Sequence, residues 1–469
     1  DRTLCFEDAH YRHADFASVH IGDFVLGSSK GGTGTEGGGA VGGGAGRLPL
    51  VSVVMPVHDG VQFLEEAMES VFAQTYLGPW ELIIVDDGST DGSAALARAV
   101  VAKPTHADVE LVEIGAGGAG GAGGAGSSGA GSSGAGSSGA AGSNRSVILL
   151  ELGTNRGVAP ALDAGIALAR GKYVARMDAD DVCLRTRFQR QVNYLERHSE
   201  VAVLGCAVEI FRDESGVSGG DVVDNRVISL PRSPRAVEWG MWFYCALAHP
   251  TVMMRREAVF GRGEAGRGER YANNAEGKKG KKKTVAEDYA LWLRLVTPKD
   301  TPPLRLANLG HVLLRLRKHG ANVSRRRQGQ QADEGMRAVA WALSRRLGRE
   351  VTVRTVQCLQ RPEKADAASE MHAAAELLLA LEQSYAVIGN GGRGEEGADW
   401  VQIKEGEGAA ASEGDGGIDG FIAEDTTARL RAMSVTGLQR FAGDAAPLLQ
   451  LVQSREGGGS KGLMAAFGF

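Results

Sequence analysis

Three aspartates, Asp178, Asp180 and Asp181, follow the apolar segment 173–177 almost without a gap. Carboxylates at this spacing repel one another and raise each other's pKa, so they are usually tolerated where a cation or a very polar ligand lies between them. A hard divalent cation that is held by one or two carboxylates and by the phosphates of a ligand would fit this group. The spacing therefore predicts metal-assisted binding of a phosphorylated ligand.

Two earlier apolar segments also end in side chains that can bind a ligand. His58 and Asp59 follow the first segment, and Asp86 and Asp87 follow the second. Aspartates favour turns and helix caps as well, which would account for any one of them taken alone. Three such groups at three segment ends favour a common ligand site instead.

The elements that must position these groups can be predicted from the hydrophobic pattern. Apolar runs typical of strands buried on both faces of a sheet occur at 48–57, 80–86, 146–152, 172–178, 201–211, about 250–255 and 311–320. Helical patterns occur at 63–72, 92–102, 155–171, 184–197 and 286–296. This alternation predicts an α/β fold with an open, mostly parallel sheet and helices on both faces. Ligands of such sheets bind beyond the carboxyl ends of the strands, so the polar groups should meet at one edge.

Stretches rich in glycine divide the chain into five predicted regions. These are a flexible leader at 1–46, an α/β domain at 47–330, a helical extension at 331–388, a linker at 389–420 and C-terminal helices at 421–469. Within the α/β domain, the segments at about 115–143 and 261–284 have the composition of disordered surface insertions. The second contains Lys278–Lys283, a run typical of a solvated loop.

Composition and charge argue against several classes of protein. A net charge of -5 argues against a nucleic-acid partner. Five widely spaced cysteines without a CxxC pair argue against a zinc site or a disulfide framework and favour a reducing compartment. No apolar run is long enough for a transmembrane segment, so a cytoplasmic protein, or one on the cytosolic face of a membrane, is the default expectation. The chain begins at Asp1 and not at Met, so an upstream signal or anchor stays open.

Six segments, in order, resemble the inverting glycosyltransferases of family 2, which have the GT-A fold. They are VSVVMPVHDG, ELIIVDDGSTDGS, NRGVAPALDAGIALARGKYVARMDADD, AHPTVMMRR, AEDYALWLRLV and VLLRLRKHGANVS. Apart from the two insertions, they cover about 50–325 of the chain. The resemblance implies that 47–330 is a GT-A nucleotide-diphospho-sugar transferase domain.

The resemblance also implies roles for individual residues. The donor nucleotide would be bound by Pro56, Val57, His58, Asp86, Asp87, Asn155, Arg156, Asp178 and Ala179. Among these, Asp87 would contact the base, and Asp178 would contact the ribose or the metal shell. Asp180 would reach the diphosphate and a divalent metal, Mn²⁺ or Mg²⁺, to which His319 would be a further ligand. Asp288 would be the catalytic base.

The implied activity is the transfer of a sugar from a nucleotide-diphosphate donor, with a UDP-sugar favoured, to an acceptor hydroxyl with inversion. The metal would neutralise charge on the departing phosphate, and Asp288 would take the proton of the acceptor. The acceptor, whether glycan, lipid or protein, stays open. The alternative is a catalytically silent homologue that binds a nucleotide sugar.

Other functions fit the sequence less well. A nicotinamide-dependent oxidoreductase should carry GxGxxG directly after the first strand, where this chain has PVHDGVQF. A nucleotidyltransferase would need a loop with glycine and lysine at the same place. Trp239, Trp242, Phe243 and Tyr244 could stack on an acceptor sugar, but an aromatic stripe at helical spacing is more often part of a core.

Overall fold

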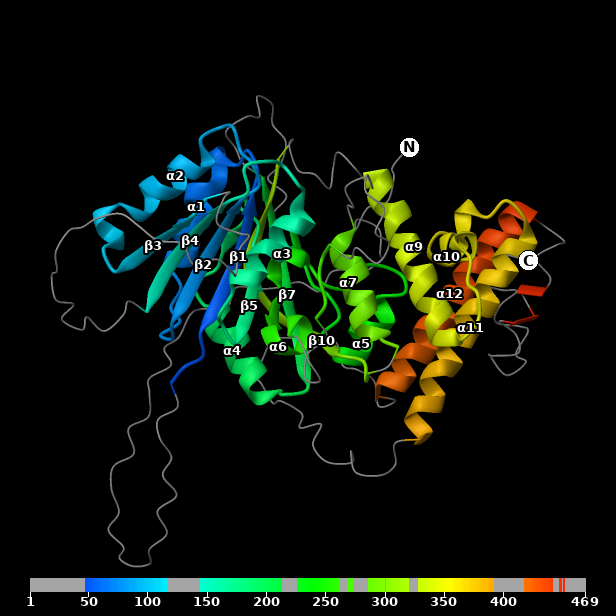
Figure 1. The fold of residues 1–469 in the computed structure, drawn as a ribbon. Coiled ribbons are helices and arrows are strands. Elements are labelled where there is room, and N and C mark those ends of the chain that lie inside the picture. The colour runs from blue at the N-terminus through cyan, green and yellow to red at the C-terminus, as the bar shows by residue number, and fades with distance from the viewer. Residues whose placement is uncertain are drawn as a thin grey trace, which may run out of the picture. The chain divides into compact units, whose positions relative to one another are not determined.

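The computed structural model describes most of the chain from Arg47 onward (Figure 1). The described residues are 47–115, 144–212, 226–261, 268–272, 286–299, 301–319, 328–391, 417–441, 447–448 and 450–451. Several predicted regions lie outside these residues: the leader, most of both insertions with Lys278–Lys283, and most of the linker.

Among the described residues, ten strands form one sheet with the order β3-β4-β2-β1-β5-β9-β7-β10-β6, and β8 pairs with β7. The strands are β1 (Val51–Val57), β2 (Trp80–Asp86), β3 (Val109–Ile114), β4 (Arg145–Glu151), β5 (Tyr173–Arg176), β6 (Val182–Cys183), β7 (Val201–Arg212), β8 (Arg226–Ile228), β9 (Met253–Arg255) and β10 (Arg305–Lys318). From β3 to β5 every neighbouring pair is parallel, whereas β9 is antiparallel to both β5 and β7. The predicted open, mostly parallel sheet is confirmed.

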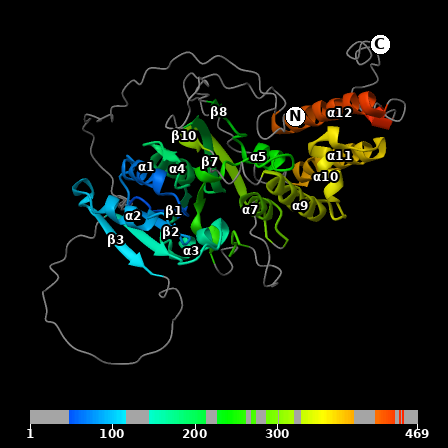
Figure 2. The same ribbon diagram turned by 90° about the horizontal axis from the view of Figure 1, so that it is seen from above.

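Helices cover both faces of this sheet (Figure 2). Successive side chains of a strand point to opposite faces, so Val53 and Met55 of β1 pack with one set of helices and Val54 with another. The first set is α1 (Val61–Phe72), α2 (Ser93–Val101) and α4 (Arg187–Arg197). The second set includes α3 (Val158–Leu168). The predicted two-sided packing is therefore confirmed.

The core on the α3 side continues into the C-terminal half of the chain. It takes in α5 (Pro234–Gly240), α6 (Arg256–Phe260), α7 (Glu287–Val296), α9 (Gln328–Leu347), α10 (Val353–Gln360), α11 (Ala368–Gly391) and α12 (Gly417–Phe441). In Figure 1, the yellow to red helices α9 to α12 lie beside α5 and α7. Trp239, Trp242 and Phe243 are buried in this core, as the aromatic pattern favoured. No helix in the described ranges is both long and apolar enough to cross a membrane.

Several segments differ from the prediction, including the short strands β6 and β8, which were not expected. The edge strand β3 was not expected, because its sequence VELVEI alternates apolar and acidic residues and it is only partly buried. The strand expected from about residue 250 begins at Met253, after the short helical turn η2 (His249–Thr251). Within the segment 261–284, expected to be a disordered insertion, Tyr271 is only 3% exposed. Its N–H and that of Ala272 donate to the Asp163 carboxylate at 2.8 and 2.9 Å.

Candidate active site

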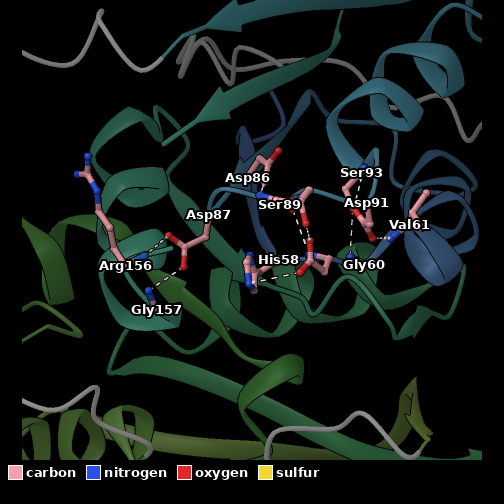
Figure 3. Close-up of polar contacts among 12 residues, drawn as sticks. His58, Gly60, Val61, Asp86, Asp87, Ser89, Asp91, Ser93, Arg156 and Gly157 are labelled. Atoms are coloured by element: carbon pink, nitrogen blue, oxygen red, sulfur yellow. Dashed lines mark hydrogen bonds and ion pairs between the residues drawn. The ribbon is translucent and has the colours of Figure 1, made fainter. Parts of the chain in front are cut away.

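The loops that follow β1 and β2 are tied together by hydrogen bonds from backbone to side chain (Figure 3). Asp59 Oδ1 accepts a hydrogen bond from Thr90 N–H at 2.8 Å. Val61 N–H donates to Asp91 Oδ2 at 2.8 Å, so the loop after β2 satisfies the start of α1. Asp59 has a φ of 51°, the only positive value among the described residues other than glycine. This sharp turn positions His58, whose Nε2 lies 3.6 Å from Asp59 Oδ2.

Asp86 and Asp87, at the end of β2, both bind backbone N–H groups (Figure 3). Asp86 Oδ1 accepts from Ser89 N–H at 2.7 Å. The two carboxylate oxygens of Asp87 accept from Arg156 and Gly157 N–H, each at 2.7 Å. These N–H groups directly precede α3, at whose N-terminus unpaired N–H groups and the helix dipole favour a negative charge. Asp87 therefore fixes Arg156 beside the end of β2.

A glycine allows the loops after β2 and β4 to approach this closely. Gly88 has a φ of 75°, and a Cβ at this position would lie 2.8 Å from Asn155 N and Thr154 C. Only glycine avoids both the strain and the clash.

Pro56 and Val57 pair with the end of β2 in the sheet, so they lie at the same edge of the sheet. Val57 as a whole is only 4% exposed, it belongs to the core, and its O accepts a hydrogen bond from Asp87 N–H at 2.9 Å, so little of it is left to line a donor site.

The third acidic group follows β5. One carboxylate oxygen from each of Asp178, Asp180 and Asp181 lies within 4.8 Å of the others. Arg176 donates to both oxygens of Asp178, at 2.6 and 2.5 Å. Asp181 Oδ1 accepts from Arg317 N–H at 2.9 Å, whereas its Oδ2 is buried and has no hydrogen-bond partner among the described residues. An orphaned buried carboxylate oxygen beside two further carboxylates fits a hard cation.

Burial and mutual repulsion act on the pKa values of this group. Burial raises the pKa of Asp181 well above its usual value, and the charge of Asp178 raises it further. Burial also raises the pKa of Asp178, although the guanidinium of Arg176 opposes the effect. A cation bound between these carboxylates would favour their charged forms.

Ala179 lies opposite the turn after β1, because a Cβ at Gly60 would be 4.0 Å from Ala179 Cβ.

The end of β10 lies against the same acidic group. The guanidinium of Arg317 lies over the rings of Phe63 and Phe211, at 4.7 and 4.5 Å from their centroids, and its Nε donates to Asp180 O at 2.9 Å. His319 packs on Phe63, and its Nε2 lies 2.9 Å from Asp180 Oδ2. The two residues that were expected to bind a metal are thus within hydrogen-bond distance of each other.

Asp288, the expected base, lies in the first turn of α7 in a second acidic group with Glu287 and His249. Its Oδ2 lies 3.8 Å from His249 Nδ1, which is too long for a hydrogen bond, and the Asp288 side chain is 17% exposed. Burial raises the pKa of Asp288. Burial, followed by the charge of Asp288, raises the pKa of Glu287 to about 8, so Glu287 keeps its proton at pH 7. Burial lowers the pKa of His249 well below its usual value, so His249 is neutral.

The two acidic groups are close enough for the charge of Asp288 to raise the pKa of Asp178. Sequence reasoning placed neither Arg176 nor Glu287 in the site. The signal for Arg176 was a single arginine in a strand of otherwise apolar residues, since a buried guanidinium requires a charged partner. Glu287 gave no comparable signal, because acidic residues are common in the first turn of any helix.

The matches to known proteins give this arrangement a class. Residues 52–126 and 137–259 match the model of the family described as Glycosyl transferase family 2. These matched residues, less than half of the chain, are similar to glycosyltransferase family 2, the family that the six ordered segments resemble.

Two curated relatives and one solved structure illustrate the match. The putative glycosyltransferase EpsE of Bacillus subtilis is 30% identical over 210 residues, which cover 45% of this chain and 58% of EpsE. The amylovoran biosynthesis glycosyltransferase AmsE of Erwinia amylovora is 32% identical over 181 residues, or 39% of this chain and 58% of AmsE. The chain therefore spans less than two thirds of either relative. The mannosyltransferase PcManGT from Pyrobaculum calidifontis, solved with GDP-Man and Mn²⁺, is 16% identical with a TM-score of 0.41, over 73% of this chain and 79% of PcManGT.

Proposed function

We propose that this protein transfers a sugar from a nucleoside diphosphate sugar to an acceptor hydroxyl, with inversion at the anomeric carbon. The match to the family model supports the transfer of a sugar. The observation that carries the finer proposal is the pair of neighbouring acidic groups, Asp178 to Asp181 after β5 and Asp288 in α7. The first group suits the diphosphate of the donor, and the second suits the hydroxyl of the acceptor.

The nucleotide would bind at the carboxyl ends of β1 and β2, beside the start of α3. His58 and Asp87 directly follow these strands, Asp86 is the last residue of β2, and Asp87 orders the backbone at Arg156. The N–H groups at a helix start and a set of side-chain hydrogen-bond acceptors are suited to a base, a ribose and phosphates. A UDP-sugar is the donor that the family resemblance implies.

The acidic group after β5 has the chemistry of a divalent metal site. Asp180 and Asp181, with His319, would hold Mn²⁺ or Mg²⁺, and a bound ion supplies positive charge that stabilises the departing diphosphate. The orphaned Oδ2 of Asp181 supports this assignment. Arg317 N–H holds the other oxygen of Asp181, and Arg176 holds Asp178, so the carboxylates are oriented before any ligand binds.

Asp288 would accept the proton of the acceptor hydroxyl as its oxygen attacks the anomeric carbon. Because burial raises the pKa of Asp288, its carboxylate is a stronger base than an exposed aspartate. Burial and the charge of Asp288 raise the pKa of Glu287 to about 8, so the protonated form of Glu287 is favoured beside Asp288 near neutral pH. A single displacement from the face opposite the diphosphate inverts the anomeric centre.

The test separates donor binding from transfer. Thermal stability is measured with UDP, GDP, CMP and NAD, each with and without Mn²⁺, in the wild type and in Asp180→Ala. One nucleoside diphosphate should stabilise the wild type only with Mn²⁺, by about 2.7 kcal/mol at one hundred times Kd, and should not stabilise Asp180→Ala. No response to any diphosphate would overturn the proposal.

Transfer is then followed with the matching labelled nucleotide sugar and pooled glycan, lipid and protein acceptors. Asp288→Asn should still bind the nucleotide but should lose transfer. A wild-type protein that binds a nucleotide sugar and transfers it to no acceptor would instead be the catalytically silent homologue.

A further inference from the structure

Phe63, in the first turn of α1, is buried without being part of a hydrophobic core. It is 8% exposed, yet neither of the two cores that the described residues form includes it. Its ring lies instead against two polar side chains at the end of β10. The guanidinium carbon of Arg317 and the ring centroid of His319 are each 4.7 Å from the centroid of the phenyl ring. A buried phenylalanine is typically part of an apolar core, so this placement points to a task in the site.

The backbone of Phe63 is fixed by the loops of the proposed nucleotide site (Figure 3). Gly60 N–H donates to Ser93 Oγ at 3.0 Å, and Val61 N–H donates to Asp91 Oδ2 at 2.8 Å. Phe63 N–H then donates to Gly60 O at 3.1 Å within the first turn of α1. The ring therefore stands on a turn whose backbone is held in place, and it can serve as a rigid support.

The Arg317 guanidinium has other partners besides the Phe63 ring. It forms an ion pair with Glu66, which is also on α1, and its Nε donates to Asp180 O at 2.9 Å. It also lies over the ring of Phe211, 4.5 Å from the centroid. These contacts would remain if the phenyl ring were removed, so the position of the arginine does not depend on that ring.

The imidazole of His319 is oriented by its packing on Phe63. The two ring planes meet at 48°, and His319 Nε2 lies 2.9 Å from Asp180 Oδ2. A carboxylate accepts hydrogen bonds, so Nε2 donates to it in the protein without metal, and it gives up that proton when it binds a metal. A hydrogen bond fixes one atom of the imidazole, whereas contact with its face also fixes the plane of the ring. Groups that orient a metal-binding histidine in this way strongly affect metal affinity.

We propose that Phe63 is a positioning residue: its ring holds the imidazole of His319 in the orientation that directs Nε2 toward Asp180. The first turn of α1 thereby links the loops of the proposed nucleotide site to the acidic group after β5. The orientation of His319 is a property of the folded chain, whereas its use as a metal ligand rests on the proposed function.

The experiment compares Phe63→Leu with a matched control on the same helix. Phe63→Leu removes the ring but keeps an apolar side chain, and it changes no charge. Phe72→Leu is the control, because Phe72 is also 8% exposed and also packs its ring on a histidine, which is His106 at 4.5 Å. Both changes remove a buried ring from α1, so a general loss of stability should appear in both variants.

The first readout needs neither metal nor nucleotide. It is the NMR relaxation of the Cε1–H group in protein with ¹³C-labelled histidine, and the His319 signal is identified by its absence from His319→Ala. In the wild type, the order parameter of this group should be close to the rigid value of about 0.85. In Phe63→Leu it should fall to about 0.6 or below, whereas in Phe72→Leu it should stay as in the wild type.

The second readout is the Mn²⁺ concentration that gives half of the thermal stabilisation by the nucleoside diphosphate. In Phe63→Leu this concentration should rise by about tenfold or more. In Phe72→Leu it should stay within about twofold of the wild type, even if the melting temperature falls. In a protein that already carries His319→Ala, adding Phe63→Leu should change it by less than about twofold, because the phenyl ring acts through His319.

Three results would overturn the inference. They are a His319 ring that stays equally ordered in a folded Phe63→Leu, an equal loss of order in Phe72→Leu, and a tenfold effect of Phe63→Leu that persists in the protein with His319→Ala. The proposed function can fail separately. If His319 loses its order in Phe63→Leu but no diphosphate requires Mn²⁺ to stabilise the wild type, the positioning by Phe63 is supported and the proposed metal site is refuted.

Discussion

Replacing Asp87 by alanine should lower the free energy of unfolding by about 2–4 kcal/mol, because two hydrogen bonds to a carboxylate at the start of α3 are lost. Each bond is 2.7 Å long, and the side chain is 4% exposed. A bond to a charged group contributes about 1.5–3 kcal/mol, and two bonds that share one carboxylate contribute less than twice that amount. The N–H of Arg156 lies in an exposed residue, where water replaces the lost acceptor, so the sum stays well below the additive maximum.

The measurement is urea-induced unfolding followed by tryptophan fluorescence. Asp87→Asn keeps one carbonyl oxygen as an acceptor and should lose about half as much stability as Asp87→Ala. Asp108→Ala is the control, because Asp108 is 61% exposed and its ion pair with Arg145 is 3.5 Å long. Its effect should stay within about 0.5 kcal/mol. An Asp87→Ala protein as stable as this control would refute the reasoning. If Asp87→Asn were as stable as the wild type but did not bind the nucleotide, the carboxylate would act on the ligand instead.

Three further predictions concern stability. Gly88→Ala should cost about 1–3 kcal/mol in the same urea assay, because a residue with a side chain is strained at a φ of 75° and its Cβ would lie 2.8 Å from the backbone at Asn155; no loss would show that the loop relaxes. Tyr385→Phe should cost about 1–2 kcal/mol by thermal unfolding, since it leaves Trp242 Nε1 without the hydroxyl that it now reaches at 2.8 Å. The pKa of Glu287 is raised from 4.5 to about 8 in the folded protein. Between these two pH values the folded state binds a proton that the unfolded state releases. The stability that protonated Glu287 contributes is therefore lost as the pH rises from about 4.5 through 8. Glu287→Gln should therefore flatten the fall in melting temperature between about pH 5 and pH 8.5, and an unchanged slope would contradict the assignment.

The hydrophobic pattern of the sequence predicted those strands whose residues are almost all buried. The strands β1, β2 and β4 are long runs of apolar residues, so their positions and their parallel pairing could be predicted from the pattern alone. The edge strand β3 could not be predicted, because an edge strand is held by its neighbour's backbone and needs no continuous apolar run. The antiparallel direction of β9 could not be predicted either, because the sequence of a three-residue strand does not indicate which strand it pairs with or in which direction.

The same limit applies to the candidate site. The carboxylates were visible because they follow strands, and strand ends can be found in a sequence. Pairings that depend on distant segments were not visible, such as Arg317 N–H with Asp181 or the two N–H groups at 271 and 272 with Asp163. Tyr271 lies in a segment whose overall composition is polar, yet its burial and the contact of its ring with His249 place it in the core. Composition averages over such a segment, whereas burial is decided residue by residue.

The C-terminal helices, to which the sequence assigned no role, share a hydrophobic core with the helix that carries Asp288. A Cβ at Gly335 of α9 would lie 3.2 Å from the Tyr289 ring, and the Tyr289 hydroxyl donates to Met241 O at 2.5 Å. The next residue, Trp242, is bound by Tyr385 of α11. The contacts at Tyr289 are made by the residue that directly follows the proposed base, Asp288. A change in α9 or α11 should therefore alter activity through the order of the first turn of α7, and its effect on transfer should follow its effect on stability.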